Sequence, residues 1–246
     1  MVKKKDLKQL LNLNFTTLSE QTYSVGKYDL PYVICPENIS IDYLALYSHV
    51  GEYNKTDNTA VCFYQYDNVF DGIYGIFNAI YYRDEKRLRF FKERFKNVKY
   101  FIAPDYSQCG DINAIENLYR IFKSRLVSLW FILELGTITI PNVTYANENY
   151  FDSMLNGMED ASVVAFSVKG SMKNPKQREL LIKAIRKTVD SLPKLKRIIV
   201  YSVCSSDDCV ITLFEYAINK NIEVIIPDNI LRKQNIERSN EANGKD

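Results

Sequence analysis

Glycine is scarce in this sequence, and histidine and tryptophan occur once each: nine Gly, one His and one Trp among 246 residues. So little glycine excludes a collagen-like chain, and neither of the glycine-rich phosphate-binding motifs, GxGxxG and GxxxxGK[ST], occurs. Because His49 is the only histidine, HExxH chemistry is excluded, and a Ser-His-Asp triad would have to use this one imidazole. We interpret His49 as a hydrogen-bonding residue at a strand end.

Cysteine pairs of the CxxC type are also absent. The five cysteines are Cys35, Cys62, Cys109, Cys204 and Cys209. An odd number without such pairs argues against structural disulfides and against a tetrahedral zinc site, so we expect reduced, mostly buried thiols. In the segment CSSDDC (204–209), Ser and Asp before a helix are what capping and the helix dipole favour, and we expect no metal site there.

The sequence lacks both a strong charge imbalance and a long apolar run. Its net charge is +2, so no overall polycation forces binding to nucleic acid or to a membrane. The most apolar run, LVSLWFILEL (126–135), is about half the length that spans a bilayer, and we interpret it as the buried half of a helix. The N-terminal residues contain no apolar stretch long enough for a signal peptide. These features predict a cytoplasmic protein with no membrane partner.

Aromatic and β-branched residues, in contrast, are abundant, with 18 Tyr and 13 Phe. Short apolar runs rich in these residues alternate with longer runs of helical period. The predicted strands are Tyr32–Cys35, Leu44–Ser48, Ala60–Tyr66, Lys99–Ala103, Thr137–Ile140, Ser162–Val168, Arg197–Val203 and Glu223–Ile226. The clearest predicted helix is Pro175–Leu192, with Asn174 as its N-cap, and another covers about residues 113–135.

This alternation predicts an α/β fold with a parallel sheet, because most of the runs are continuously apolar, as in strands covered on both faces. Eight strands with helical crossovers suggest a (β/α)₈ barrel. The first two connections are too short or irregular for full crossovers, so an incomplete parallel barrel is the alternative. We expect a single domain over residues 1–231 and a disordered tail over 232–246, where apolar residues run out.

Three strands end in the same way: FIAPD (101–105), ITIPN (138–142) and VIIPDN (224–229) place Pro and then Asp or Asn after an apolar run. Because ligands of parallel α/β folds bind at the carboxyl ends of the strands, the polar residues there are candidate site residues. We predict catalytic roles for Asp105 and Asp67. We predict ligand-binding roles for Ser107, Asn142, Ser167, Lys169, Ser171, Tyr201 and Asp228. Asp and Asn in such places are equally typical of turns.

Three further segments have functional interpretations. FSVKGSMKNPK (166–176) runs from a strand through Lys169, Gly170 and Ser171 into a capped helix, an arrangement that can hold an anion but is also typical of an ordinary turn. The stretches 83–99 and 169–197 carry eight and ten basic residues against three and two acidic ones. They could follow a phosphate backbone. We favour solvated outer helix faces instead.

Several motifs, taken in order, resemble an uncharacterised bacterial and phage family, the domain of unknown function 4417 group. The matching positions are Asp67 with Phe70; Pro104 to Ser107; Asn117, Tyr119 and Arg120; Arg125; Gly136, Ile140 and Pro141; and Ser167 with Gly170. The resemblance covers about residues 60–205. It departs at Tyr145, where the family often has Trp, and at Ser202, where it often has Gly. The family has no established activity, so the resemblance implies a barrel-like fold and a phage or mobile-element setting, and it favours one shared site for Asp67, Asp105, Ser107 and Ser167.

We therefore predict a protein that binds a small polar or phosphorylated ligand, with a nucleotide among the candidates, at the carboxyl ends of the strands. Asp105 and Asp67 would supply acid–base or orienting groups, and Lys169 would hold an anion. Neither turnover nor a cofactor is specified by the sequence. The alternative is a non-catalytic protein that binds a host protein or nucleic acid through its outer surface, with nucleic acid the less favoured partner.

Overall fold

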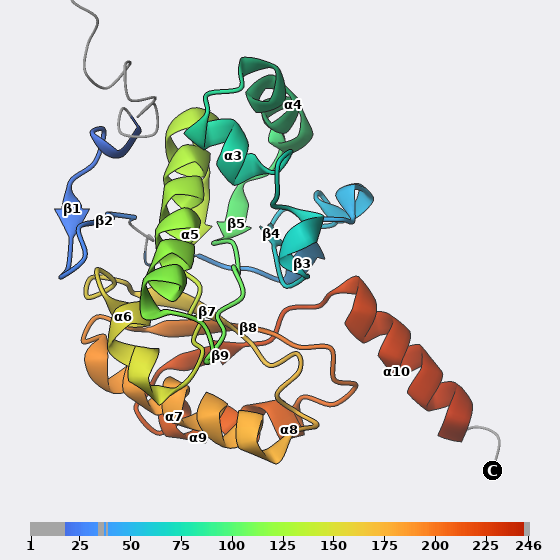
Figure 1. Ribbon diagram of the computed structural model, residues 1–246. Coiled ribbons are helices and arrows are strands. Elements are labelled where there is room, and N and C mark those ends of the chain that lie inside the picture. Colours follow the sequence, from blue (N-terminus) through green and yellow to red (C-terminus); the bar gives the residue numbers. More distant parts are fainter. Residues whose placement is uncertain (1–17, 34–36, 38, 244–246) are drawn as a thin grey trace, which may run out of the picture.

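The chain forms two parallel β-sheets covered by helices (Figure 1). The computed structural model describes residues 18–33, 37 and 39–243. The first sheet has the order β3 (Tyr43–Leu46), β4 (Thr59–Cys62), β5 (Tyr100–Ile102) and β6 (Ile138–Ile140). The second has the order β7 (Val163–Ser167), β8 (Arg197–Tyr201) and β9 (Glu223–Ile225). Neighbouring strands within both sheets are parallel, which confirms the predicted α/β class.

The N-terminal region differs from the prediction. There, β1 (Ser24–Val25) and β2 (Leu30–Pro31) form a two-stranded antiparallel sheet. The predicted strand Tyr32–Cys35 is wrong for residues 32 and 33, which follow β2 without continuing it, whereas residues 34 and 35 lie outside the described part. The reason is local: Tyr32 N–H donates to the Tyr23 carbonyl, and the two rings stack with centroids 4.4 Å apart. The run is thus held against this hairpin and adds no strand to a parallel sheet.

The helices lie in the connections between the strands and after the last strand (Figure 1). Between β4 and β6 lie η2 (Asp67–Val69), α3 (Ile76–Tyr81), α4 (Glu85–Phe95) and α5 (Ala114–Leu135). Between β6 and the C-terminus lie η3 (Glu148–Tyr150), α6 (Phe151–Leu155), α7 (Pro175–Ser191), α8 (Asp208–Ile211), η4 (Thr212–Phe214), α9 (Glu215–Ile218) and α10 (Ile230–Asn243). The β3–β4 connection contains only η1 (Val50–Glu52), in agreement with its predicted shortness.

The two long predicted helices, over about residues 113–135 and over Pro175–Leu192, are present as α5 and α7, and residues at their ends explain where they begin or end. The Asn174 side chain accepts hydrogen bonds from the N–H groups of Lys176 and Gln177 at the start of α7. Gly136, with φ of 65°, ends α5, and residues 126–131 in the second half of that helix are buried. None of the helices among the described residues is long and apolar enough to cross a membrane.

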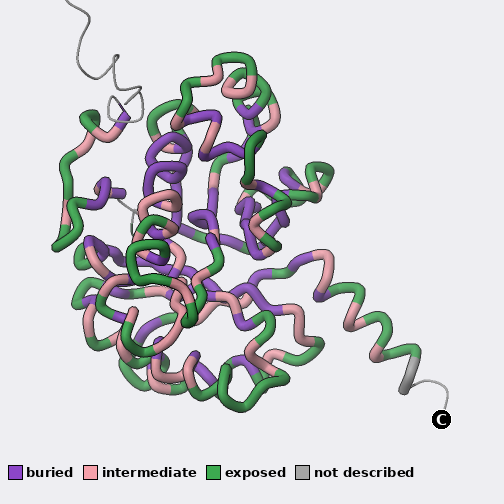
Figure 2. The backbone as a smooth tube through the Cα atoms, in the orientation of Figure 1, coloured by how far each residue is buried: buried purple, intermediate pink, exposed green. Residues whose placement is uncertain are grey.

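Buried side chains form three layers. Figure 2 shows which parts of the chain are buried. One layer packs the first sheet against α3, α4 and α5, and a second packs β7 and β8 against α6, α7 and α9. The third combines side chains from β3, β4, β5, β6, β7 and β8, so it lies between the two sheets. The first layer is largely aromatic: the rings of Phe101 on β5 and Phe131 on α5 stack with centroids 3.9 Å apart.

Two isolated parallel bridges connect the sheets, and both occur directly after a proline. Asn142, after Pro141, bridges to Ala165 on β7, and Asp228, after Pro227, bridges to Tyr43 on β3. Pro141 and Pro227 cannot donate to a neighbouring strand. In both cases the chain pairs with one neighbour before the proline and with a strand of the other sheet after it. The repeated Pro-Asp/Asn device therefore marks two of the places where the sheets meet.

The C-terminal segment is a helix, α10, where the sequence predicts a disordered tail for residues 232–246. Arg232 is buried and donates to the Ile226 carbonyl, and Asn235 donates to the Val203 carbonyl at 2.7 Å. These polar contacts anchor the start of α10, and the apolar pattern of the sequence does not reveal them. The rest of the helix projects away from the sheets (Figures 1 and 2).

The aromatic layer leads to a first prediction. Replacing fully buried Phe131 by Ala should lower the free energy of unfolding by about 3–5 kcal/mol, because it leaves a cavity beside Phe101 and Phe95. The matched control is Phe90→Ala on α4, where the ring is 57% exposed, and it should cost less than about 0.5 kcal/mol. Urea unfolding of both variants measures the difference, and similar losses would contradict the packing described.

Candidate functional site

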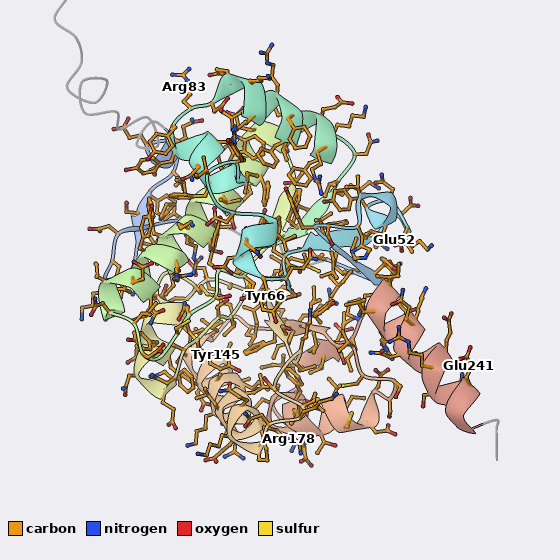
Figure 3. The ribbon with its side chains drawn as sticks, turned by 45° about the vertical axis from the view of Figure 1, so that its right-hand side comes forward. Glu52, Tyr66, Arg83, Tyr145, Arg178 and Glu241 are labelled. Carbon is orange, nitrogen blue, oxygen red and sulfur yellow. The ribbon has the colours of Figure 1, made fainter. Side chains whose placement is uncertain are left out.

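A cleft of about 420 Å³ lies at the carboxyl ends of β4, β5 and β7. Its lining residues are Tyr64, Gln65, Tyr66, Val69, Asp105, Ser107, Ser167, Lys169 and Gly170. Figure 3 labels Tyr66 near the middle of the molecule, between the halves that carry the two sheets. Four of the predicted site residues, Asp105, Ser107, Ser167 and Lys169, are thus brought to one cleft by strands from both sheets.

Asp105 lies three residues beyond the end of β5, after Pro104, and is held on one oxygen only. Its Oδ1 accepts hydrogen bonds from Asn142 Nδ2 at 3.0 Å and from Thr144 Oγ1 at 2.8 Å, and neither bond uses Oδ2. The pKa of this carboxyl is raised to about 6, mainly by burial and also by the charge of Asp67, while the Thr144 and Asn142 hydrogen bonds act in the opposite direction. A carboxyl with this pKa can exchange a proton near neutral pH.

Asn142 connects Asp105 to the interior between the sheets. Its Oδ1 accepts a hydrogen bond from Tyr64 OH at 2.8 Å, while its Nδ2 donates to Asp105. The Tyr64 ring stacks on Tyr201 with centroids 4.8 Å apart. Tyr201 is fully buried, and burial raises the pKa of its phenol. It packs against Tyr64 in the interior and does not line the cleft.

Lys169 follows β7 on the other side of the cleft. Its Nζ donates to the Tyr64 carbonyl at 3.3 Å, and its backbone N–H donates to Ser167 Oγ at 3.2 Å. Gly170, with φ of 90°, allows the chain to turn directly after this lysine. The side chain is exposed, so its ammonium group can meet an anionic ligand in the cleft.

Asp67 has a different environment, although it also follows a strand. Its carboxylate accepts hydrogen bonds from Ser107 N–H and Ser107 Oγ, the latter at 2.8 Å, and forms an ion pair with Arg120 at 3.0 Å. These bonds fasten the segment after β5 to the segment after β4 and to α5. Both oxygens of Asp67 have partners, in contrast to Asp105.

The remaining predicted residues do not line the cleft. Ser171 lies in the turn before α7, where its N–H donates to the Val168 carbonyl. Asp228 is exposed at the bridge to β3, with Lys233 Nζ 3.7 Å from its Oδ2. His49 Nδ1 lies 2.9 Å from Ser48 Oγ at the end of β3, a local contact of the kind predicted.

The prediction of mostly buried thiols is wrong for the described cysteines. Cys62 is buried, but Cys204 is partly exposed and Cys109 and Cys209 are exposed, because the last three lie in loops or at a short helix and not in strands. Within the described residues, no three potential ligands of the His, Cys, Asp or Glu type gather around a metal-sized position.

Sequence reasoning missed Thr144, Arg120 and Tyr66 as site residues. Thr144 lies two residues after Asn142, and an extended chain places two such residues on the same side. This spacing could have identified Thr144 as a site residue from the sequence. Arg120 lies on a helix far along the chain from Asp67, and the sequence contains no signal for that ion pair.

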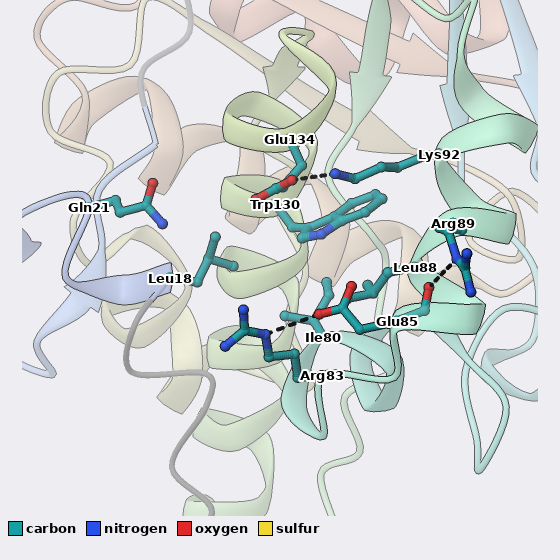
Figure 4. A pocket seen from close by; sticks show the side chains of 10 residues that line it. All are labelled: Leu18, Gln21, Ile80, Arg83, Glu85, Leu88, Arg89, Lys92, Trp130 and Glu134. Atoms are coloured by element: carbon teal, nitrogen blue, oxygen red, sulfur yellow. Dashed lines mark hydrogen bonds and ion pairs between the residues drawn. The ribbon is translucent and has the colours of Figure 1, made fainter. Parts of the chain in front are cut away.

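A second cavity, of about 310 Å³, lies away from the strand ends (Figure 4). It is formed by Leu18 and Gln21, by α3 and α4, and by Trp130 and Glu134 of α5. Its basic residues are engaged: Lys92 pairs with Glu134 at 2.6 Å and Arg83 with Glu85 at 3.1 Å.

Both basic stretches of the sequence are similarly compensated. Lys183 on α7 pairs with Glu148 at 2.7 Å, and Lys187 pairs with Asp152 at 2.7 Å. Arg94 on α4 turns inward, where its guanidinium lies over the Tyr47 ring and donates to the Tyr47 carbonyl. These basic side chains are therefore engaged in contacts within the protein.

The fold and the cleft define an α/β protein with parallel sheets and a candidate site at the carboxyl ends of its strands. Residues 22–217 match the family described as Domain of unknown function (DUF4417), and the chain belongs to that family. The match confirms the resemblance drawn from the motifs and extends it beyond residues 60–205. No curated protein and no solved structure matches the chain.

The two aspartates lead to a second prediction, on stability. The pKa of Asp105 in the folded protein, about 6, exceeds its usual value, so its contribution to stability is present at low pH and is lost as the pH rises through about 6. Asp105→Asn can accept the same two hydrogen bonds without a charge. Relative to the parent, this variant should therefore gain about 1–3 kcal/mol between about pH 4 and about pH 7.

The comparison variant is Asp67→Asn. It loses the charge that pairs with Arg120 and should be less stable than the parent at neutral pH by about 1 kcal/mol. Urea unfolding of the three proteins across this pH range measures both effects. If Asp105→Asn were less stable than the parent at neutral pH, the carboxylate charge of Asp105 would have a structural role, and our description of the site would be incorrect.

Proposed function

We propose that the two sheets together form one parallel barrel of seven strands. The support comes from the two bridges and the strand registers. Along the first sheet the paired positions are Leu44, Ala60, Tyr100 and Ile138. The circuit continues through the Asn142–Ala165 bridge, the second sheet and the Tyr43–Asp228 bridge back to the first sheet. Summed over these registers, it closes with a displacement of about eight residues along the chain. A stagger of about eight residues is that of (β/α)₈ barrels.

At the mouth of this barrel, the protein binds a small polar or phosphorylated ligand. The observation that carries this proposal is the cleft in which Asp105, restrained on Oδ1 alone, and the exposed Lys169 come from different sheets. Lys169 holds an anionic group of the ligand, and the hydroxyl groups of Ser107 and Ser167 provide further hydrogen bonds. Asp105 Oδ2 accepts a hydrogen bond or a proton from the ligand.

A nucleotide is the ligand class that fits this cleft best. Tyr66 lines the cleft with a ring that is 85% exposed, so a planar base can stack on it. Lys169 would then meet a phosphate group. Together the two residues offer a stacking face and a cation, which are the two contacts that a nucleotide needs most.

Turnover, if it occurs, depends on Asp105, because its raised pKa suits acid–base catalysis near neutral pH. Asp67 is a positioning residue in this proposal, since Ser107 and Arg120 occupy its oxygens. Its role is to fix the segment that carries Asp105 and to place a negative charge nearby.

The second candidate function is binding of a host protein, in the phage or mobile-element setting and the cytoplasm that the sequence suggests. The observation that favours it is the exposed apolar segment after β4, where Tyr66, Val69, Ile73 and Tyr74 are 41–85% exposed. Exposed aromatic residues of this kind are frequent in protein interfaces. Nucleic acid is less favoured because the basic helices are compensated by ion pairs.

The ligand proposal gives the third prediction. Mass spectrometry of small molecules released from the purified, denatured protein should find a nucleotide or other phosphorylated compound. Thermal shift with inorganic phosphate and a panel of nucleotides should reveal the same preference. Lys169→Ala should weaken binding about 10-fold or more, because it removes the ammonium group. Asp105→Asn should abolish turnover and weaken binding while leaving the protein folded.

The control is Lys173→Ala, four residues from Lys169 and also exposed, but outside the cleft. It should bind as the parent does. Equal binding by the parent, Lys169→Ala and Asp105→Asn would refute the site. If the parent binds no member of the panel and releases no small molecule, the host-protein alternative is favoured.

A further inference from the structure

A third, much smaller cavity lies beside the candidate site. It measures about 20 Å³ and is enclosed by the segments after β5 and β6 and by α5 and α6. Asn142 and Thr144, which hold Asp105 from one side, line this cavity as well. A volume of this size accommodates one water molecule or one monatomic ion, and no polyatomic ligand.

The cavity is lined by residues whose buried polar atoms have no hydrogen-bond partner in the described part of the chain. These atoms are Arg125 Nη1, Arg120 Nε, Tyr106 OH and Gln108 Oε1. Two of them can only donate, and the Tyr106 hydroxyl can donate too, because burial raises the pKa of this phenol and keeps it protonated. Rotating the Gln108 amide by 180° places its Nε2 donor where its oxygen now lies.

Charges of both signs lie around the cavity, and the carboxyl of Asp105 is hydrogen-bonded to its lining residues Asn142 and Thr144. Arg120 is compensated by Asp67 at 3.0 Å and by Glu116 at 3.4 Å. Arg125 is 6% exposed, and its Nη2 donates only to a neutral group, the Asn156 carbonyl, at 3.4 Å. The negative charge of the exposed Glu159 attracts the Arg125 guanidinium electrostatically. Among the residues that the structure describes, no carboxylate is in contact with the Arg125 guanidinium, and a buried charge needs a counter-charge.

We propose that this cavity binds a monatomic anion of the size of chloride, held by Arg125, Arg120 and Tyr106. A water molecule would satisfy the donors but would leave the charge of Arg125 uncompensated, whereas a halide does both. The site is separate from the ligand cleft, and its occupation does not depend on the function proposed for that cleft. Its place between α5 and the segments after β5 and β6 makes the anion a structural ligand that fixes Asn142 and Thr144.

Bromide tests the site directly, because it replaces chloride and scatters anomalously. Crystals of the full chain grown in sodium bromide should contain a bromine peak within hydrogen-bond distance of Arg125 Nη1. Arg125→Met should lack that peak. The matched control is Arg178→Met, which removes an exposed arginine on α7 outside the cavity and should retain the peak.

Melting temperatures provide the solution measurement. At constant ionic strength, sodium gluconate is the reference, because gluconate is too large for the cavity. Above the dissociation constant, each tenfold rise in chloride should raise the melting temperature of the parent and of Arg178→Met by about 3–5 °C. Arg125→Met should show no chloride dependence.

If Arg125→Met does not fold, two measurements on the parent test the proposal. They are the bromine peak in the cavity and the difference between the melting temperatures in chloride and in gluconate. Absence of a bromine peak in the parent cavity would overturn the proposal and assign the cavity to water. So would a peak that persists in Arg125→Met, or equal melting temperatures of the parent in chloride and gluconate.

Discussion

Asn142 is the residue on which the arrangement of the site most depends. It lies opposite Ala165 in the parallel bridge where the two sheets meet, and its neighbours Pro141 and Val143 make the backbone hydrogen bonds of that bridge. Its side-chain amide accepts from Tyr64 and donates to Asp105, so it connects the segments after β4 and β5. One amide group thus couples the junction of the sheets to the position of the carboxyl group. Any shift of β7 against β6 would move Asp105 relative to Lys169.

Two aspartates at equivalent strand ends acquire different chemistry from their neighbours. Asp67 meets a guanidinium and a backbone N–H, which satisfy its negative charge. Asp105 meets an amide and a hydroxyl in a partly buried position, and these neutral donors offset only part of the cost of removing the charge from water. The sequence context of the two residues is similar, so the difference arises entirely from the tertiary structure.

The sequence predicts the repetitive part of this fold well, because parallel strands covered on both faces are recognisable as short apolar runs. It also places Asp105 and Lys169 at strand ends, and the cleft contains both. It fails where the decisive contacts are polar and distant: Asn235 with Val203 in α10, and Arg120 with Asp67 across about 50 residues. It also fails at Tyr32, where a local ring stack with Tyr23 determines the pairing of an apolar run.

The bridge between Tyr43 and Asp228 has a consequence for the order of folding during synthesis. The first sheet is complete once β6 has left the ribosome, since its four strands lie between residues 43 and 140. One edge of β3, however, meets its partner only when Asp228 emerges, after every strand of the two parallel sheets has been synthesised. Until then that edge offers unpaired backbone groups to other chains. Its side chains offer little protection, since all four residues of β3 are apolar and buried in the finished fold. The nascent chain therefore passes through an interval in which the β3 edge is open to association with other chains.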